Sequence, residues 1–439
     1  MQNAEAISRV IEIVRGRLDK KPIVVVSAMS KVTDLLYKIS AAAGEGDFKT
    51  AEAMIEDLRM RHLGVCENLL EGSTFVDGAN LRVNEICNSL LSFVKAVCEV
   101  GDLSPRSMAR IISRGEVLSS TIISFAMNAR GISTNLIDAG RMVITDDEYM
   151  KGEPDIDAIC SRAPAVVAKA FKGMDAVITQ GFVAATADGR VTVLGRGGSD
   201  YSASLIGMAV KAKSVEIWTD VNGVMTADPR VVSKPISLPE ISFEEAAEMA
   251  HFGAKVLHPM TIEPAVKADI PIYVLNSMSP SDAGTGIFRS SFIRGGVKSV
   301  SSKENILVIN IFSTKMINVS GFLSKVFRVF SDNKVSVDLI GTSEASISVT
   351  VDASTYIDKV VEQLSAFSKV RVDRDKAQVS VIGKDLIWEP GIFRSIFTAV
   401  EGKRIYMISQ GSSFINISLV VDRDSCKDVV RAIHKGLFE

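Results

Sequence analysis

VTVLGRGGSD, the stretch Val191–Asp200, decides the fold of the first two thirds of this chain. A short β-branched run leads into a glycine-rich turn, and a helical pattern follows over Tyr201–Ala212. Glycines let backbone N–H groups approach a polyanion, and a helix N-terminus favours negative charge. Arg196 adds a fork of donors suited to a carboxylate or a phosphate. The stretch alone fits an anion site and a plain turn, capped by Ser199 or Asp200, equally well.

The sequence around this stretch alternates between strand and helix patterns. Pro22–Ser27 is a β-branched run of the kind buried on both faces of a parallel sheet. Further apolar runs that predict buried strands are Ile132–Ile137, Ala176–Thr179, Val215–Thr219 and Ile272–Leu275. Residues 48–130 are almost wholly helical in pattern, and Asp188-Gly189 predicts a hairpin within Val183–Leu194. The alternation predicts an α/β fold, in which helices sandwich a mostly parallel sheet.

The pattern changes near residue 280. Ser277–Gly284 is a predicted loop, and Ser301–Asn305 is a predicted linker. Beyond them the chain runs twice through a strand, a helix, two strands, a helix and a strand. The predicted strands include Ile306–Phe312 and Val335–Leu339 in the first pass, and Ala377–Ile382 in the second. Two ferredoxin-like units of roughly 65 residues each are therefore predicted, and we expect them to pair edge to edge.

Composition limits the class of protein. A chain of 439 residues predicts two to three domains. Lys plus Arg total 50 and Asp plus Glu total 52, so the net charge of -2 gives no electrostatic case for nucleic acid or an anionic membrane. Any anion must be held by a local site. Five scattered cysteines, no signal peptide, and no apolar run of roughly 20 residues predict a cytoplasmic protein.

Polar residues follow a second predicted strand. Thr219 and Asp220 lie at its end, and Arg230 comes shortly after. Ligands of open parallel sheets bind at the carboxyl ends of strands, so these residues are candidates for nucleotide contact, with an ordinary polar turn as the alternative. Lys255, within Phe252–Pro259, could reach phosphates as a point charge, although a lone lysine is more often a solvated side chain.

Three more candidates lie earlier in the chain. Ser27 and Thr33 flank the turn after the first strand, where each could be a cap or a substrate contact. Glu116 follows Ser113-Arg114-Gly115 within a helix or at a helix junction. Its carboxylate could accept a hydrogen bond from a substrate ammonium group, or be a surface charge.

Together these blocks resemble the aspartate kinases of the amino-acid kinase superfamily. The resemblance rests on VVVSAMSKVTDLL, SRGEVLSS, ITQGFVAATADGRVTVLGRGGSDYSAS, IWTDVNGVMTADPRVV, EAAEMAHFGAKVLHP and IPIYVLNS. It implies phosphorylation of L-aspartate to 4-phospho-L-aspartate by ATP with Mg²⁺, the first step toward lysine, threonine, methionine and diaminopimelate. Met225 stands where many relatives carry a tyrosine beside the nucleotide, so that contact is in doubt.

The resemblance also implies roles for single residues. Arg196, Asp200 and Lys255 would act in catalysis, and no residue is predicted to ligate a resident metal. The aspartate contacts would be Ser27, Thr33, Glu116, Arg196, Ser199 and Asp200. The ATP contacts would be Gly195, Gly197, Gly198, Thr219, Asp220, Arg230 and Lys255.

The two C-terminal units resemble ACT domains of lysine-inhibited aspartate kinases. The implied domains are a kinase domain at residues 1–295 and ACT domains at 304–373 and 374–439, with a homodimer or higher homo-oligomer formed through the latter. Asp338 could pair with an effector ammonium group, while N–H groups near Ser320-Gly321 take its carboxylate. The implied contacts of L-lysine are Met316, Ser320, Gly321, Phe322, Leu323, Val337, Asp338, Thr342, Ser343 and Glu344.

One departure from the family leaves a second hypothesis open. The family begins with a strand leading into Lys-Phe-Gly-Gly-Thr-Ser, whose lysine helps to hold phosphates, and this chain begins beyond that element. We expect that the working protein is longer, because the other motifs are intact. The alternative is a catalytically impaired protein that senses lysine through its ACT domains. A kinase of another amino acid is disfavoured by the tandem ACT units, and a dehydrogenase by the lack of an early G-x-G-x-x-G.

Overall fold

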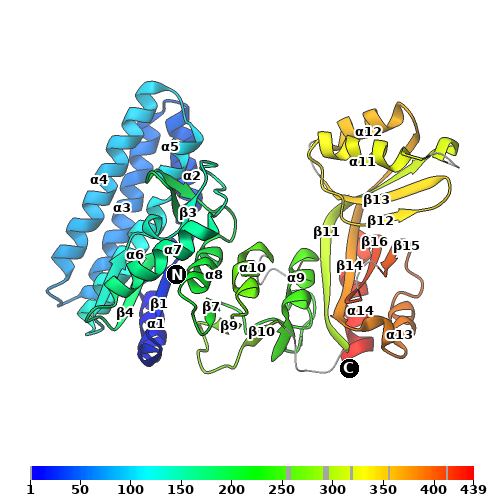
Figure 1. Ribbon diagram of the computed structural model, residues 1–439. Coiled ribbons are helices and arrows are strands. Elements are labelled where there is room, and N and C mark those ends of the chain that lie inside the picture. Colours follow the sequence, from blue (N-terminus) through cyan, green and yellow to red (C-terminus); the bar gives the residue numbers. More distant parts are fainter. Residues whose placement is uncertain (1, 254–258, 290–295, 317–319, 354–355, 412–413) are drawn as a thin grey trace. The chain divides into compact units, whose positions relative to one another are not determined.

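The computed structural model describes residues 2–253, 259–289, 296–316, 320–353, 356–411 and 414–439 (Figure 1). The chain divides into two compact units. The first comprises residues 1–222 and 258–283, and the second comprises residues 223–257 and 284–439.

The first unit contains most of the helices. They are α1 (Ala4–Arg15), α2 (Val32–Gly44), α3 (Phe48–Leu70), α4 (Val76–Val100), α5 (Pro105–Ile112), α6 (Arg114–Ala129), α7 (Ile156–Ala170), α8 (Gly198–Ala209) and α10 (Pro259–Lys267), with 3₁₀ turns η1 (Leu18–Lys20) and η2 (Ala139–Arg141). Its strands are β1 (Ile23–Val26), β2 (Thr134–Ile137), β3 (Ile144–Thr145), β4 (Ala176–Gln180), β5 (Val183–Thr186), β6 (Val191–Val193), β7 (Val215–Thr219) and β9 (Ile272–Asn276).

Parallel strands form the centre of this unit. β4 lies between β1 and β2, with Ile23 opposite Val177 and Thr134 opposite Ala176. Every residue of β4 is buried, as its apolar run predicts. β7 and β9 form a second parallel pair. These strands confirm the predicted parallel sheet.

The predicted hairpin is also present. β5 and β6 are antiparallel, and β5 also pairs with β3. The turn between β5 and β6 contains Gly189 at φ +84, a left-handed conformation that glycine adopts without strain. α3 and α4 pack against each other as a long helical pair (Figure 1). The predicted helical stretch of residues 48–130 is interrupted near Gly72, between α3 and α4, and near Ser104, before α5.

The second unit is built around one large antiparallel sheet. Its helices are α9 (Phe243–His251), α11 (Phe322–Asp332), α12 (Ile357–Ser365), α13 (Ile392–Ala399) and α14 (Cys426–Phe438), with 3₁₀ turns η3 (Thr314–Met316), η4 (Leu386–Trp388) and η5 (Arg423–Ser425). Its strands are β8 (Glu240–Ser242), β10 (Thr285–Phe288), β11 (Gly296–Phe312), β12 (Ile340–Thr342), β13 (Ser346–Asp352), β14 (Lys369–Lys384), β15 (Ile405–Gln410) and β16 (Asn416–Asp422).

The strand order β12-β13-β11-β14-β16-β15 joins two ferredoxin-like halves into one sheet. Two long strands cross both halves: β11 and β14 pair from Gly296 opposite Lys384 to Phe312 opposite Lys369. α11 and α12 cover the first half, where Phe330 and Leu364 join Ile309 and Val349 in one apolar core (Figure 1). The predicted edge-to-edge pairing and the α/β fold class are confirmed.

Two predicted elements of this unit were wrong. The linker predicted at Ser301–Asn305 lies inside β11, where Ser301 pairs with Ser380 and Lys303 with Gln378. The strand continues despite its polar sequence because a bulge, with Asn305 at φ +62, absorbs the irregularity. The strand predicted at Val335–Leu339 begins later, at Ile340.

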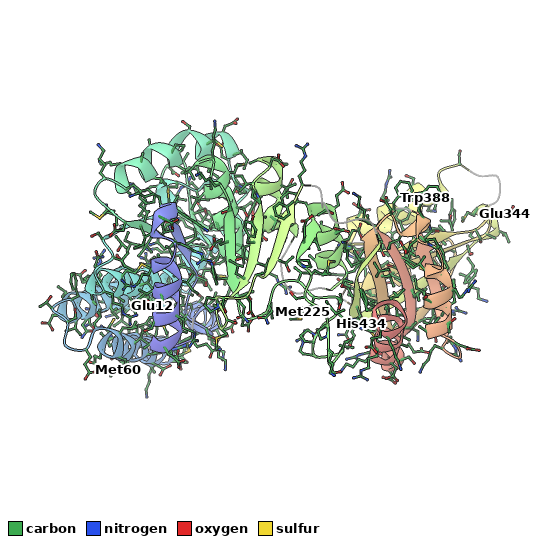
Figure 2. All side chains as sticks on the ribbon, turned by 90° about the horizontal axis from the view of Figure 1, so that it is seen from below. Glu12, Met60, Met225, Glu344, Trp388 and His434 are labelled. Atoms are coloured by element: carbon green, nitrogen blue, oxygen red, sulfur yellow. The ribbon has the colours of Figure 1, made fainter. Side chains whose placement is uncertain are left out.

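The last helix ties the segment after Asn222 into this unit. His434 on α14 is buried, and its Nε2 lies 2.9 Å from Thr226 Oγ1. Arg431 donates a hydrogen bond of 2.8 Å from Nε to the carbonyl oxygen of Val231. Met225, labelled with His434 in Figure 2, forms an isolated β-bridge with Ser237. Among the described residues, no helix combines the length and the apolar character needed to cross a membrane.

Candidate active site

The glycine-rich loop of Val191–Asp200 rests directly on the carboxyl end of β4. Gly195 and Gly197 have φ of +74 and +72, and α8 begins at Gly198. A Cβ added to Gly181, which follows β4, would lie 2.7 Å from Ser199 Oγ. Gly181 also donates a backbone hydrogen bond of 2.8 Å to Val26 at the end of β1. The loop therefore lies where the neighbouring strands β1 and β4 both end.

Phe182 holds the loop in this position. Its backbone has φ +64, an unusual value for a side chain of this size. Its N–H donates to Ser202 Oγ on α8 at 3.0 Å, and its carbonyl oxygen accepts from Leu194 N at 2.9 Å. Both ends of the glycine-rich loop are thus tied to one residue, which fixes the start of α8.

Glu116 lies beside the end of β1. α5 ends at Ile112 and α6 begins at Arg114, so Glu116 is in the first turn of α6, at the predicted junction. Its side chain is buried, and Oε1 accepts a hydrogen bond of 3.2 Å from Ala28 N. Ser119 Oγ donates to the carbonyl oxygen of Ser27 at 2.8 Å. These two contacts bring α6 and the loop after β1 together.

The second oxygen of Glu116 is available for a donor from outside the chain. Among the described residues, Glu116 Oε2 is buried and has no hydrogen-bond partner. Burial raises the pKa of this carboxyl to about 7, because the charged form loses its hydration. A ligand ammonium group placed here would satisfy the oxygen and favour the ionised form.

Asp200 is the second carboxyl group with a raised pKa at this edge. It lies in the first turn of α8, and burial raises its pKa to about 6. Arg196, four residues earlier, is exposed, and Thr33 is half-buried in the first turn of α2. The contacts above thus place Ser27, Glu116 and Ser199 around the same strand ends, and Asp200 follows Ser199 in the first turn of α8.

The predicted nucleotide contacts fall in different parts of the chain. Thr219 ends β7, its Oγ1 donates to Asp220 Oδ1 at 3.2 Å, and its carbonyl oxygen accepts from Ser277 N at 2.8 Å. Arg230 belongs to the second unit, where it pairs with Asp228 at 2.6 Å. Lys255 lies outside the described residues.

The predicted effector residues form two groups on one chain. In the first group, Ser313 N donates to Ala345 O at 3.0 Å and so joins the end of β11 to the loop after β12. This group contains Met316, Ser320, Gly321, Phe322, Leu323, Thr342, Ser343 and Glu344.

Val337 and Asp338 form the second group. Asp338 N donates to Thr350 O at 2.9 Å, whereas Ser343 N of the first group donates to Ser346 O. Thr350 and Ser346 are four residues apart on β13, which corresponds to roughly 13 Å along a strand. One chain alone therefore does not bring Asp338 next to Ser343.

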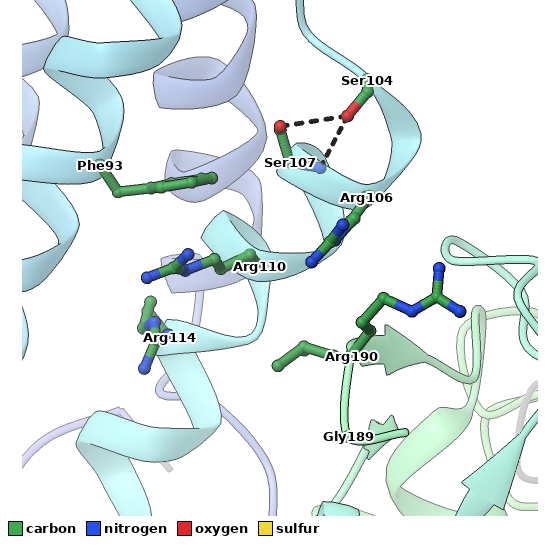
Figure 3. A pocket seen from close by; sticks show the side chains of 9 residues that line it. Phe93, Ser104, Arg106, Ser107, Arg110, Arg114, Gly189 and Arg190 are labelled. Atoms are coloured by element: carbon green, nitrogen blue, oxygen red, sulfur yellow. Dashed lines mark hydrogen bonds between the residues drawn. The ribbon is translucent and has the colours of Figure 1, made fainter. Parts of the chain in front are cut away.

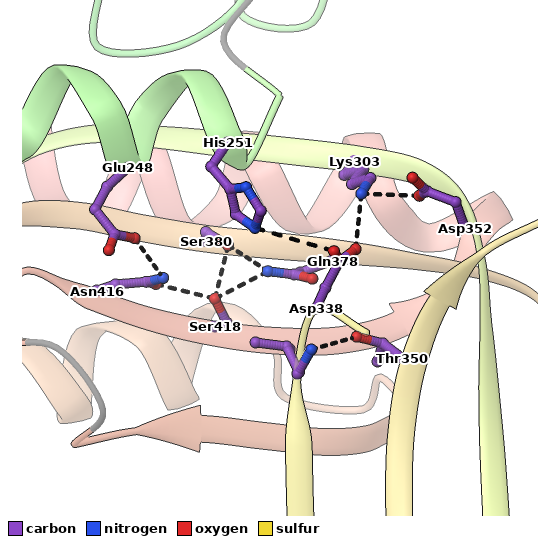
Figure 4. A network of polar contacts seen from close by, with 11 residues as sticks. Glu248, His251, Lys303, Asp338, Thr350, Asp352, Gln378, Ser380, Asn416 and Ser418 are labelled. Carbon is purple, nitrogen blue, oxygen red and sulfur yellow. Dashed lines mark hydrogen bonds and ion pairs between the residues drawn. The ribbon is translucent and has the colours of Figure 1, made fainter. Parts of the chain in front are cut away.

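Asp338 is already paired within the chain (Figure 4). Lys303 Nζ lies 2.7 Å from Asp338 Oδ2 and 2.8 Å from Asp352 Oδ1, and the side chain of Asp338 is only 8% exposed. His251 Nε2, from the last turn of α9, lies 4.0 Å from Asp338 Oδ1. The carboxylate of Asp338, which was predicted to bind the effector, thus already has the ammonium group of Lys303 as its partner.

The helix α9 also contacts the other half of the sheet. Asn416 on β16 donates from Nδ2 to Glu248 Oε2 at 3.1 Å, and Asn416 Oδ1 accepts from Ser418 Oγ (Figure 4). A capping box at Ser242 and Glu245 fixes the start of α9. Through Glu248 and His251, one helix therefore contacts both ferredoxin-like halves.

Comparison with known proteins explains this combination of folds. The model of the amino acid kinase family matches residues 1–276, and that of an ACT domain matches residues 309–366 and 379–437. The lysine-sensitive aspartokinase 3 of Escherichia coli (strain K12) is 33% identical over 447 residues, covering 99% of this chain and 96% of the relative. The chain belongs to the aspartokinase family.

Other members of the family agree with this assignment. The chloroplastic aspartokinase 3 of Arabidopsis thaliana is 35% identical, over 100% of this chain and 80% of the relative. The crystal structure of E. coli aspartokinase III with aspartate and ADP, titled as the R-state, has a TM-score of 0.84 at 32% identity and covers 100% of this chain and 97% of that one. The lysine and aspartate complex, titled as the T-state, has a TM-score of 0.82 with the same identity and coverage.

The aspartokinase family, predicted from the motifs, is therefore confirmed. Two residues with structural importance were not singled out from the sequence. Gly181 was part of the ITQGF block, but its contact with Ser199 follows only from the strand order. Lys303 was in the segment predicted as a linker, so its pairing with Asp338 was missed.

Proposed function

We propose that this member of the aspartokinase family transfers the γ-phosphoryl group of MgATP to the β-carboxylate of L-aspartate, forming 4-phospho-L-aspartate and ADP. Its main support is the glycine-rich loop, which contacts Gly181 at the end of β4, together with the buried and unpartnered oxygen of Glu116 near the end of β1. Among the relatives, the E. coli enzyme supports the proposal, because its crystal structure contains aspartate and ADP. The reaction would be the first step toward lysine, threonine, methionine and diaminopimelate.

Aspartate carries one ammonium and two carboxylate groups, and the site offers a partner for each kind. Glu116 would accept from the ammonium group through Oε2. The guanidinium of Arg196 would take a carboxylate in a bidentate pair, with Ser27, Thr33, Ser199 and Asp200 completing the contacts. Binding of the ammonium group would lower the raised pKa of Glu116, so substrate binding and ionisation of this residue would be coupled.

The transfer itself requires alignment more than base catalysis. The β-carboxylate is ionised at neutral pH, so its oxygen attacks the γ-phosphorus without giving up a proton. The bond from the γ-phosphorus to the β,γ-bridging oxygen breaks, and ADP leaves with that oxygen. Backbone N–H groups at the start of α8, together with Arg196 and Lys255, would stabilise the negative charge of the transferring group.

The nucleotide contacts are an extension of the same proposal. Gly195, Gly197 and Gly198 would approach the phosphates, and Thr219, Asp220, Arg230 and Lys255 would hold the rest of the nucleotide. Magnesium would enter bound to the phosphates of ATP and supply charge neutralisation. The proposed kinase domain spans residues 1–295.

L-Lysine is the proposed feedback inhibitor, acting on ACT domains at residues 304–373 and 374–439. The relatives that support this role are the lysine-sensitive E. coli enzyme and its lysine-bound T-state structure. In one chain the two groups of effector residues are roughly 13 Å apart along β13. We infer a homodimer or higher homo-oligomer formed through the ACT domains, in which a second copy could complete the pocket. The proposed location is the cytoplasm.

The experiment that tests the proposal is aspartate-dependent release of ADP, measured with and without L-lysine. We expect turnover that lysine suppresses, and a large loss of turnover in Arg196→Ala. Arg162→Ala, an exposed residue on α7, is the matched control. Full turnover in Arg196→Ala would contradict the assigned site. A folded protein that binds lysine, yet releases no ADP, would instead support the alternative of an impaired lysine sensor.

A further inference from the structure

A pocket of about 530 Å³ in the first unit is lined by four arginines (Figure 3). Arg106 and Arg110 come from α5, Arg114 from the start of α6, and Arg190 from the hairpin between β5 and β6. Phe93 on α4 forms part of the wall. The volume is within the range of small-molecule sites. None of these residues is among the proposed contacts of aspartate, ATP or lysine.

The sequence spacing explains why the arginines converge. Arg106, Arg110 and Arg114 are four residues apart, and helical residues at this spacing share one face. Ser113 keeps a helical backbone between α5 and α6, with φ -62 and ψ -17, so the face continues across the junction. Arg190 approaches from the opposite wall, because the Gly189 turn directs the chain back toward α5.

Two of the arginines are held in place by neighbours, and of these two only Arg190 is paired with a carboxylate. The guanidinium carbon of Arg110 lies 4.2 Å from the centre of the Phe93 ring. Arg190 donates to Tyr149 Oη at 2.6 Å and pairs with Asp188 at 2.8 Å. A cation over an aromatic face is oriented without being neutralised. The pocket is therefore prearranged while most of its positive charge stays uncompensated.

Carboxylates near the pocket are few. In the described part of the chain, Arg106, Arg110 and Arg114 form no ion pair within 4.0 Å, and Asp188 pairs with Arg190 alone. Burial, and after it the positive charge of Arg110, lower the pKa of Arg114, while Asp138 raises it. The three like charges of Arg106, Arg110 and Arg114 repel each other unless an anion lies among them.

We propose that this pocket binds a small phosphate-bearing anion with at least two negative charges. Guanidinium forks match phosphate oxygens two at a time, and three forks on one helical face suit more than one phosphate or a phosphate with a second anionic group. The pocket would be a ligand site additional to the catalytic and lysine sites. Arg114 and Glu116 share the first turn of α6. A ligand bound in the arginine pocket would therefore also alter the affinity for aspartate.

Inorganic pyrophosphate is the probe for this site. Calorimetric titration is done at low salt on the full chain, with saturating aspartate and a non-hydrolysable ATP analogue, so that the proposed catalytic phosphate positions are filled. We expect binding at one site. Replacing both Arg106→Gln and Arg110→Gln should weaken it at least tenfold, whereas Arg162→Gln on α7 should bind as the unmodified chain does.

Thermal unfolding is a second measurement, and its first readout needs no ligand. At low salt and without pyrophosphate, Arg106→Gln should unfold at a higher temperature than the unmodified chain, because one repelling charge is gone. Pyrophosphate should raise the unfolding temperature of the unmodified chain but not that of the double variant. Equal affinity in the double variant, or loss of all binding when the substrates are present, would overturn the proposal.

Discussion

Lys303 Nζ lies 2.7 Å from Asp338 Oδ2, so a lysine of the chain pairs with the carboxylate that is predicted to bind an effector ammonium group. The same Nζ lies 2.8 Å from Asp352 Oδ1. An L-lysine molecule at this position would have to displace Lys303 or share Asp338 with it. The sensitivity of the enzyme to lysine would then depend on the strength of an internal ion pair.

Lys303→Met should therefore make inhibition more sensitive. One charge-assisted hydrogen bond contributes about 1.5–3 kcal/mol, so even partial release of Asp338 should lower the half-inhibitory concentration of lysine by roughly 5-fold or more. The free energy of unfolding without lysine should fall, because Asp338 loses its partner. The measurements are lysine inhibition curves and urea unfolding. Lys427→Met on α14 is the control, and an unchanged inhibition curve in Lys303→Met would contradict the competition.

Glu116 should make the use of aspartate depend on pH. Its pKa is about 7 in the free enzyme, and only the ionised form pairs with an ammonium group. We expect kcat/KM for aspartate to fall about tenfold per pH unit below that value. Glu116→Gln should remove this dependence and lower kcat/KM at pH 8 by about 10- to 100-fold, as expected for a lost charged hydrogen bond. Glu67→Gln on α3 should keep the profile, and a pH-dependent Glu116→Gln enzyme would refute the role.

Gly181→Ala tests whether the glycine-rich loop depends on the end of β4. The added methyl group would lie 2.7 Å from Ser199 Cβ and 2.8 Å from Ser199 Cα, so the loop must shift. We expect kcat/KM to fall and the free energy of unfolding to decrease by about 1–3 kcal/mol. In Gly64→Ala on α3 a methyl group would meet nothing within 4 Å, and helix propensity predicts a small gain in stability. Equal activity of the two variants would contradict the contact.

The strands and the family motifs could be predicted because they depend on local sequence. β4 and β7 come from short runs rich in apolar and β-branched residues, which favour buried strands, and the hairpin at Asp188-Gly189 has a specific turn signal. The pairing of Lys303 with Asp338 could not be predicted, because it joins residues 35 positions apart across a sheet. The polar Ser301–Asn305 segment looks like a linker in sequence. It forms a strand only because β14 supplies hydrogen-bond partners along its whole length.

The effector site shows the same limit. The predicted effector residues lie in or near η3, α11 and β12, yet Asp338 donates to Thr350 and Ser343 donates to Ser346, two residues that are four positions apart on β13. Local pattern predicts which elements carry the residues, whereas the register of β12 and β13 decides which of them meet.

Two buried groups, His62 and Glu116, should change the stability with pH in opposite directions. His62 is fully buried, and burial lowers its pKa from 6.5 to about 4. Between these values the unfolded chain takes up a proton that the folded chain does not, so the folded state loses stability as pH falls. Glu116 acts in the opposite sense: the pKa of its folded form is about 7 and its ordinary pKa is 4.5, so the folded state gains stability as pH falls through this range.

Single substitutions should separate the two effects. Relative to the unmodified chain, the free energy of unfolding of His62→Leu should rise as pH falls from 7 to 4.5, because the opposing His62 contribution is gone. Relative to the unmodified chain, that of Glu116→Gln should fall as pH falls from 7 to 4.5, because the Glu116 contribution is gone, while Asp200, whose pKa burial raises to about 6, contributes in every variant. Each slope is bounded by about 1.4 kcal/mol per pH unit, and the double variant should resemble the unmodified chain. Urea unfolding at half-unit pH steps measures all four proteins. Parallel curves for the two single variants would show that these groups do not titrate as their burial implies.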